Sequence, residues 1–352
     1  MTLNNLRQNQ IIEFLLKNGQ EKSSQIHDYL LTAKQEVSLV TIKRELSRLV
    51  KEGLLKINGN GAATNYQVTS RGRLFSEIDA HQYCQMEPDK RWGNKKYNFD
   101  LWPEINFPLF TTEEYAELNQ ASQVYQQRSA NLSPTLNQKE LARFIIELSW
   151  KSSKIEGNTY TLLDTEKLLQ QGIRSSKNSQ EEAIMIINHK KAFQFVLDQK
   201  RIFKAPTKQN LEELHKILVH DLKITSNIRA SLVGVTGSIY QPLDNQYQIN
   251  EALQDLFQAI GRLSNGYDKA LLALLGISYI QPFEDGNKRT SRLMTNAILL
   301  SHQLAPLSYR SVDEEEYRQA ILVFYELNSL TAIKKIFIEQ YKFAANNYAL
   351  AN

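Results

Sequence analysis

The chain has 352 residues, of which 42% are hydrophobic and 23% are charged. That length predicts two or three domains, and the balance is typical of a globular protein. The single cysteine, Cys84, excludes an internal disulfide framework and a zinc site with several thiolates, and it fits a reducing cytoplasm. No stretch approaches the ~18 apolar residues that cross a bilayer, and residues 1–7 lack the apolar core of a signal peptide. We therefore expect a cytoplasmic protein without a membrane partner.

Residues 1–73 are expected to fold as a winged helix-turn-helix domain. Apolar residues recur at helical spacing in three stretches, and Asn58-Gly59-Asn60-Gly61 lies between two short stretches as a hairpin turn does. The expected elements are helices over residues 6–18, 24–31 and 38–52 and strands over 54–57 and 65–68. These 73 residues hold 11 Lys and Arg against 6 Asp and Glu, whereas the whole chain has a net charge of +4. The basic surplus therefore lies in this first domain.

In a winged helix the third helix lies in the DNA major groove. The polar face of that helix supplies the candidate DNA-binding residues Thr41, Lys43, Arg44, Ser47 and Arg48. The local basic surplus favours double-stranded DNA as a partner. The alternative stays open that this face is simply solvated and that the domain docks a protein or links subunits, as in a homodimer.

Residues 74–110 are expected to form a packed linker. Gly and Pro interrupt this stretch, which has neither the period of a strand nor that of a helix. Its aromatic residues include Trp92, Tyr97 and Trp102. They indicate packing against the rest of the protein, because a flexible linker carries few aromatic residues.

Residues 111–348 have mainly helical spacing, so the fold class is expected to be mainly α. The predicted helices begin at residue 111 or 112, resume at 137, and continue over 178–198, 207–222, 271–280, 289–300, 314–328 and 330–345. Residues 228–249 differ, because Val, Gly and Pro there predict a short β-hairpin. His189, His215 and His220 lie on predicted helices, where lone histidines are more often packed or solvated than catalytic.

Residues 281–292 carry the chemistry of a polyphosphate site. Gly286 permits a backbone bend, and the amides of residues 286–288 fall at the start of a helix, where unbonded N–H groups and the positive end of the dipole attract phosphate. Arg289 and Arg292 are three residues apart, so they share a helix face and suit forked phosphate contacts. Asp285 is a candidate ligand for a Mg²⁺ ion that bridges two phosphates.

These residues resemble the loop of the Fic family, His-x-Phe-x-Asp/Glu-Gly-Asn-Gly-Arg-x-x-Arg. The matching positions are Phe283, Asp285, Gly286, Asn287, Arg289 and Arg292. The resemblance covers residues 111–348 and implies an all-helical Fic domain with a β-hairpin flap. It further implies transfer of AMP from ATP, with Mg²⁺ on Asp285 and Asn287, Arg289 and Arg292 on the phosphates. The acceptor would be a Ser, Thr or Tyr hydroxyl of a target protein.

Two positions depart from the family loop. Gln281 stands in place of the His that is thought to take the proton from the target hydroxyl, and an amide has no lone pair basic enough for that step. Loss of a general base typically costs about 10²–10⁴ in rate, so we expect nucleotide binding with little transfer. The origin of Gln281 stays open. It is either a natural loss of the base or a deliberate substitution made to trap a complex. Lys288 replaces the second Gly and resembles the Doc branch, which leaves phosphoryl transfer as another reaction.

The resemblance extends to two further segments. Ser152-x-x-x-Glu156-Gly157 is similar to an inhibitory motif of Fic proteins, whose Glu pairs with the second Arg of the loop and occupies the place of the γ-phosphate. This implies a pair between Glu156 and Arg292. Gly237, Ser238 and Tyr240 are similar to the family's flap, an edge that aligns an extended segment of the target by main-chain pairing.

A second class of function is also open. The protein would then be a nucleotide-responsive, DNA-binding transcriptional regulator, in which ATP displaces Glu156 and changes how the winged helix is presented. Such coupling requires that ATP binds two states with different affinity.

Overall fold

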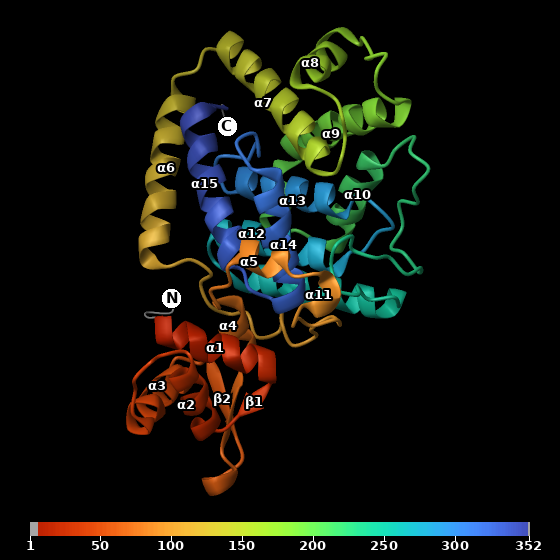
Figure 1. The fold of residues 1–352 in the computed structure, drawn as a ribbon. Coiled ribbons are helices and arrows are strands. Elements are labelled where there is room, and N and C mark those ends of the chain that lie inside the picture. Colours follow the sequence, from red (N-terminus) through yellow and green to blue (C-terminus); the bar gives the residue numbers. More distant parts are fainter. Residues whose placement is uncertain (1–5, 351–352) are drawn as a thin grey trace. The chain divides into compact units, whose positions relative to one another are not determined.

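A computed structural model describes residues 6–350. Residues 1–5, which belong to the stretch expected to lack a signal peptide, lie outside the described residues. The chain forms two compact units that are interleaved in sequence (Figure 1). The first comprises Met1–Ile105, Gly234–Gln241 and Glu315–Lys335, and the second comprises Asn106–Val233, Pro242–Glu314 and Ile336–Asn352. None of the described helices is both long and apolar enough to span a membrane.

The amino-terminal part of the first unit contains the three helices and the two hairpin strands expected from the sequence. They are α1 (Leu6–Asn18), α2 (Ser23–Thr32), α3 (Leu39–Lys51), β2 (Leu55–Asn58) and β3 (Asn65–Val68), with an additional strand β1 (Gln20–Glu21). The sheet is antiparallel in the order β1-β3-β2. Ile42 and Leu46 of α3 share a buried core with Tyr66 of β3. At two residues, β1 is too short to show an alternating pattern.

Tyr97 and Trp102 of the expected linker are buried. Residues 70–105 contribute α4 (Ser70–Leu74), α5 (Ala80–Gln85) and a 3₁₀ turn (Pro88–Lys90), and they lie in the same compact unit as most of α14 (Glu314–Leu327). Trp102 is buried and stacks on Phe324 with ring centroids 6.4 Å apart. Phe99 is an exception at 44% exposed.

The β-hairpin predicted for residues 228–249 is not formed, so that expectation is wrong. In the described structure this segment contains one isolated parallel bridge, Lys96↔Gln241, and α11 (Gln246–Arg262) already begins inside it. The buried carboxylate of Glu326 accepts hydrogen bonds from the Ser238 hydroxyl and the Ile239 amide. A side chain therefore satisfies the Ile239 amide, which a partner strand would otherwise satisfy.

The second unit is helical throughout its regular structure. Its helices are α6 (Thr112–Ala130), α7 (Pro134–Ile155), α8 (Leu162–Gln171), α9 (Gln180–Asp198), α10 (Lys208–Leu218), α11, α12 (Gly266–Ile280), α13 (Asn287–Ser301) and most of α15 (Thr331–Asn347), with a 3₁₀ helix at Lys200–Lys204. Helices α6 and α15 lie side by side (Figure 1), joined by a hydrogen bond between Ser122 and Tyr341.

Helices α12 and α13 form the centre of this unit and are buried along almost their whole length. Gly276 lets α11 approach α12 closely, because a Cβ there would lie 2.2 Å from Cδ1 of Leu256. Residues 281–286 join α12 to α13. Because this connection is short and both helices are buried, its position is fixed.

Candidate functional site

The loop between α12 and α13 has the helix, turn, helix geometry that the sequence predicts. Gln281 ends α12 with φ 52° and Gly286 precedes α13 with φ 79°, both in the left-handed region. Glycine adopts that conformation at little cost, whereas a residue with a side chain is strained by about 1–3 kcal/mol. The surrounding contacts must therefore hold Gln281 in place.

Asn287 holds the loop in shape. Its Oδ1 accepts the Phe283 N–H and its Nδ2 donates to the Phe283 carbonyl, each at 2.8 Å. Both polar atoms of the side-chain amide are thus used within the loop. A direct side-chain contact from Asn287 to phosphate, which the resemblance implies, stays a prediction, and the amide of Asn287 lies in the first turn of α13.

Two residues that sequence reasoning did not assign to the site support the loop from outside. Arg229, which is 2% exposed, donates from Nε to the Gln281 carbonyl at 2.6 Å and from its backbone N–H to the Pro282 carbonyl at 3.0 Å. The His215 ring stacks on Phe283 at 3.6 Å between centroids, with Nε2 2.9 Å from the Asp285 carbonyl. The sequence offers no signal for either, because the partners are backbone carbonyls far along the chain.

The buried histidines are packed, as expected. Burial lowers the pKa of His215 to about 4, so its ring is neutral at pH 7. A neutral ring has one N–H to give, and the Asp285 carbonyl is the closer of its two acceptors. His189 is fully buried and His220 is exposed beside Asp221.

Arg289 presents buried donors beside the loop. Its side chain is 2% exposed, and its Nη2 lies 3.2 Å from Oδ2 of Asp285. Its Nε and Nη1 have no hydrogen-bond partner among residues 6–350. Buried polar groups are nearly always bonded, so these two donors indicate room for an acceptor such as a phosphate oxygen. Burial lowers the pKa of Arg289, but a guanidinium stays charged at neutral pH.

Arg292 and Glu156 form the pair that the sequence motif predicts. Arg292 is fully buried, and its Nη1 lies 2.8 Å from Oε1 of Glu156. Ser152 accepts the other two contacts of the guanidinium, from Nε to its hydroxyl and from Nη2 to its carbonyl. Lys288 approaches the second oxygen of Glu156 at 3.6 Å. Gly157 follows with φ 95°, a conformation that turns the chain away after α7.

Glu156 is ionised at neutral pH. Burial by itself would raise the pKa of this carboxyl, but Arg292 and Lys288 outweigh burial and hold the pKa below its usual value of 4.5. One carboxylate therefore binds two cations that a polyphosphate would also need.

Asp285 fits a metal that also binds phosphate. Its side chain is 62% exposed, Oδ1 accepts the Gly286 N–H and Oδ2 contacts Arg289. The described residues contain no group of three or more His, Cys, Asp or Glu that would hold a metal by themselves. Mg²⁺ is usually held by one or two carboxylates together with water and phosphate oxygens, so one carboxylate at this position is compatible with it.

The expected flap residues are held within the first unit. Ser238 donates to Glu326 at 2.7 Å, Tyr240 is buried with its ring centroid 5.7 Å from that of Tyr325, and Gly237 has φ 77°. Because these side chains are fixed by packing, a role in aligning a target would rest on the backbone.

The candidate DNA-binding residues differ in how engaged they are. Lys43 and Arg44 are exposed on α3. Arg48 forms an ion pair of 2.9 Å with Glu52, and the Ser47 hydroxyl donates to the Lys43 carbonyl. Thr41 lies at the capped start of the helix, where its N–H donates to the Ser38 hydroxyl.

Comparison with known proteins identifies a family domain within the chain. Residues 205–299 match the model of the Fic/DOC family. "Protein adenylyltransferase Fic" from Nematostella vectensis is 29% identical over 175 residues, which are 48% of this chain and 40% of that protein. This chain thus matches about two fifths of the length of that relative.

Solved structures share the fold. Fic-1 from C. elegans has a TM-score of 0.58 at 19% identity over 67% of this chain and 72% of that one. A Fic domain containing signaling protein from Bacteroides thetaiotaomicron has a TM-score of 0.55 at 19% identity, over 65% and 94% of the two chains. The matched family segment contains the loop, Arg229 and His215. The chain therefore contains a Fic/DOC family domain, at residues 205–299.

Proposed function

We propose that this protein is a Fic-type protein adenylyltransferase that Glu156 restrains and that Gln281 impairs. The observation that carries the proposal is the arrangement of the two loop arginines. Arg292 is occupied by Glu156 and Ser152, whereas Arg289 has two buried donors without an acceptor among the described residues. The name of the Nematostella vectensis relative supports AMP transfer as the reaction.

In this proposal ATP binds at the start of α13. The amides of residues 286–288 and the guanidinium groups of Arg289 and Arg292 would take the phosphate oxygens. Asp285 would hold Mg²⁺, which supplies positive charge that neutralises the phosphates. The γ-phosphate would compete with the carboxylate of Glu156 for Arg292. Glu156 therefore lowers the affinity for ATP until it is displaced.

The proposed reaction forms a bond between a target hydroxyl oxygen and the α-phosphorus. The bond from the α-phosphorus to the bridging oxygen breaks, and pyrophosphate leaves. The hydroxyl proton needs an acceptor, which the amide of Gln281 does not provide. That amide is 7% exposed and its Nε2 donates to the Ser278 carbonyl at 2.6 Å. Transfer should therefore be slower by about 10²–10⁴ than with a positioned base.

The flap residues Gly237, Ser238 and Tyr240 complete the proposal. The N–H groups of residues 238–241 are bonded within the chain, so this segment would bind an extended stretch of the target protein through its backbone carbonyls and so select the Ser, Thr or Tyr that is modified.

Labelling with α-³²P-ATP tests this function. Wild-type protein should label itself or lysate proteins weakly, and Gln281→His combined with Glu156→Gly should raise labelling by about 10²–10⁴. Gln281→Asn serves as the matched control, since it is equally non-basic. Strong labelling by the wild-type protein would contradict the impaired state. Labelling from γ- but not α-labelled ATP would instead indicate phosphoryl transfer involving Lys288.

A second candidate function is DNA binding by residues 1–73 as a winged helix, with ATP changing its affinity. The exposed Lys43 and Arg44 on α3 and the basic surplus of this stretch favour it. Binding to labelled duplex DNA should weaken steeply as the salt concentration rises. Lys43→Ala with Arg44→Ala should lower the affinity more than Lys34→Ala does, and it should make the salt dependence shallower because fewer phosphates are contacted. DNA affinity that does not change at saturating ATP would remove the regulatory part of this idea.

A further inference from the structure

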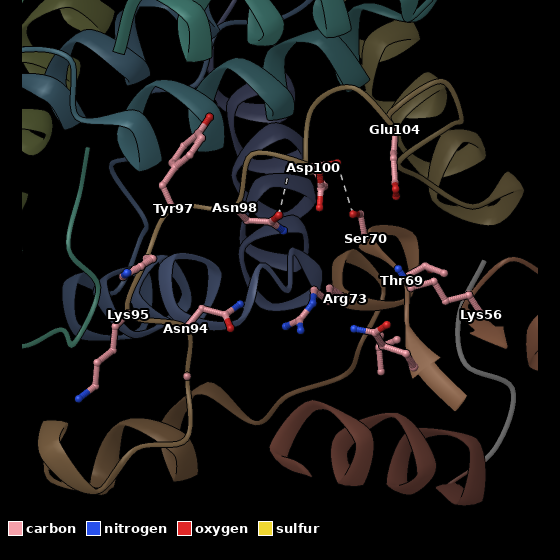
Figure 2. Close-up of a pocket in the computed structure, with 14 residues that line it drawn as sticks. Lys56, Thr69, Ser70, Arg73, Asn94, Lys95, Tyr97, Asn98, Asp100 and Glu104 are labelled. Atoms are coloured by element: carbon pink, nitrogen blue, oxygen red, sulfur yellow. Dashed lines mark hydrogen bonds between the residues drawn. The ribbon is translucent and has the colours of Figure 1, made fainter. Parts of the chain in front are cut away.

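A polar cavity of about 480 Å³ lies within the first unit and shares no residue with the nucleotide loop (Figure 2). Three segments form its wall: the β2–β3 hairpin, the start of α4, and residues 93–104. A volume of this size accommodates a molecule of nucleotide dimensions. Its lining is mainly polar, whereas most small-molecule pockets are mainly apolar, so a polar ligand is favoured.

The charges of this cavity are separated. Four cationic side chains come from three segments: Lys56 from β2, Arg73 from α4, and Lys95 and Lys96 from the third. Figure 2 shows the acidic Asp100 and Glu104 above three cationic residues, with Lys95 at the left of the view, Lys56 at the right and Arg73 between them. Neutral groups such as the Ser70 hydroxyl and the Asn98 amide lie between them. A ligand with phosphate at one end and hydroxyl groups at the other matches this distribution.

The cavity does not lie on the face that α3 occupies. Lys56 and Gln67 are directly opposed across β2 and β3 and both line the cavity. Their neighbours Leu55 and Tyr66 point into the core that includes Ile42 of α3. Successive side chains of a strand point to opposite faces, so the cavity and α3 are on different sides of the sheet. This argues for a small molecule rather than the DNA that α3 would contact.

We propose that this cavity binds a small phosphorylated sugar, nucleotides included. Arg73 takes the phosphate together with Lys95 and Lys96, and Lys56 adds positive charge on the opposite side of the cavity. Asp100 and Glu104 accept hydrogen bonds from the sugar hydroxyls.

Binding in this cavity reaches the expected flap segment. The Lys95 carbonyl accepts the Gln241 N–H at 2.8 Å, and Lys96 pairs with Gln241 in a parallel bridge. The Asn94 N–H donates to the Glu326 carbonyl at 2.7 Å. The carboxylate of Glu326 accepts the Ser238 hydroxyl. Residues 94–96 therefore line the cavity and are connected to Gln241 directly and to Ser238 through Glu326. A ligand that immobilises Lys95 and Lys96 also restrains residues 237–241.

Calorimetry with ribose 5-phosphate as the probe tests the proposal on the full chain. We expect binding that weakens about tenfold or more on Lys95→Ala with Lys96→Ala, because charge-assisted hydrogen bonds are lost. Lys90→Ala is the matched control, since Lys90 is exposed in the preceding 3₁₀ turn and does not line the cavity. Glu104→Gln should reduce the preference for ribose 5-phosphate over inorganic phosphate. All four positions are exposed, so these variants should fold.

Arg292→Ala separates this site from the nucleotide loop. Binding to the cavity should persist in that variant, and hydrogen exchange of residues 237–241 should slow when ribose 5-phosphate is added. Loss of binding in Arg292→Ala with no effect of the Lys95 and Lys96 substitutions would place the ligand in the loop and overturn the proposal. Absence of binding by ribose 5-phosphate at millimolar concentration, or a cavity that binds only duplex DNA, would overturn it as well. Neither result depends on AMP transfer.

Discussion

Arg292 and Glu156 are 136 residues apart in the sequence, and their side chains meet at 2.8 Å. The guanidinium is fully buried and the carboxylate is 19% exposed. Ser152 bonds the rest of the guanidinium, so Arg292 is satisfied without a nucleotide. Any anion that takes Arg292 must displace Glu156, and in our proposal that anion is the γ-phosphate of ATP.

Glu156→Gln should destabilise the domain that contains α7 and α13. The substitution leaves the buried charge of Arg292 without its counter-ion, and removal of one member of a buried pair costs about 3–5 kcal/mol, with less expected here because Glu156 is partly exposed. Urea unfolding of the two proteins measures the change. Glu339→Gln, at an exposed position of α15, should alter stability little. Equal stability of wild type and Glu156→Gln would show that the pair contributes nothing.

Asn287→Ala should loosen the loop. The change removes both partners of the Phe283 backbone, and each buried group left without a partner costs roughly 1–3 kcal/mol. Thermal unfolding and calorimetry with ATP would then both report a loss. Asn346→Ala, whose amide bonds at an exposed site, is the control. If Asn287→Ala kept full stability but lost ATP binding, the side chain would contact phosphate directly instead of shaping the loop.

The stability of the protein should fall as the pH drops below about 6.5. His215 has a pKa of about 4 in the folded state because of burial, against 6.5 for an ordinary histidine. Between these values the unfolded chain binds more protons than the folded one, so acid favours unfolding. His189, whose burial lowers its pKa to about 3, acts in the same direction. His215→Gln should flatten part of this dependence, measured by urea unfolding from pH 7 to 4.5, and an unchanged slope would contradict the buried neutral ring.

Glu156 changes its charge only in acid, well below neutral pH. Since its pKa lies below 4.5, the stability that it contributes is present above that pH and is lost only as the pH falls further. The contact with Arg292 is therefore constant between pH 6 and 8. Its release requires a competing anion and not a change in proton concentration.

The features of the fold and of the loop that the sequence predicts depend on local patterns of residues. The loop and its two arginines follow from residue type and helical spacing, and the helices of residues 1–73 follow from apolar periodicity. The hairpin prediction failed because buried Glu326, far along the chain, bonds the Ser238 hydroxyl and the Ile239 amide. Arg229 and His215 were missed for a related reason, since each bonds a carbonyl that any residue would provide.

The measurement that tests the central claim most directly is calorimetry of ATP with Mg²⁺. The wild-type protein should bind ATP weakly, Glu156→Gly should bind it at least about tenfold more tightly, and Arg292→Ala in that background should abolish the gain, as expected when a charged partner competes for a phosphate site. Absence of any heat of ATP binding by Glu156→Gly, with the variant shown to be folded, would contradict a nucleotide site at the start of α13.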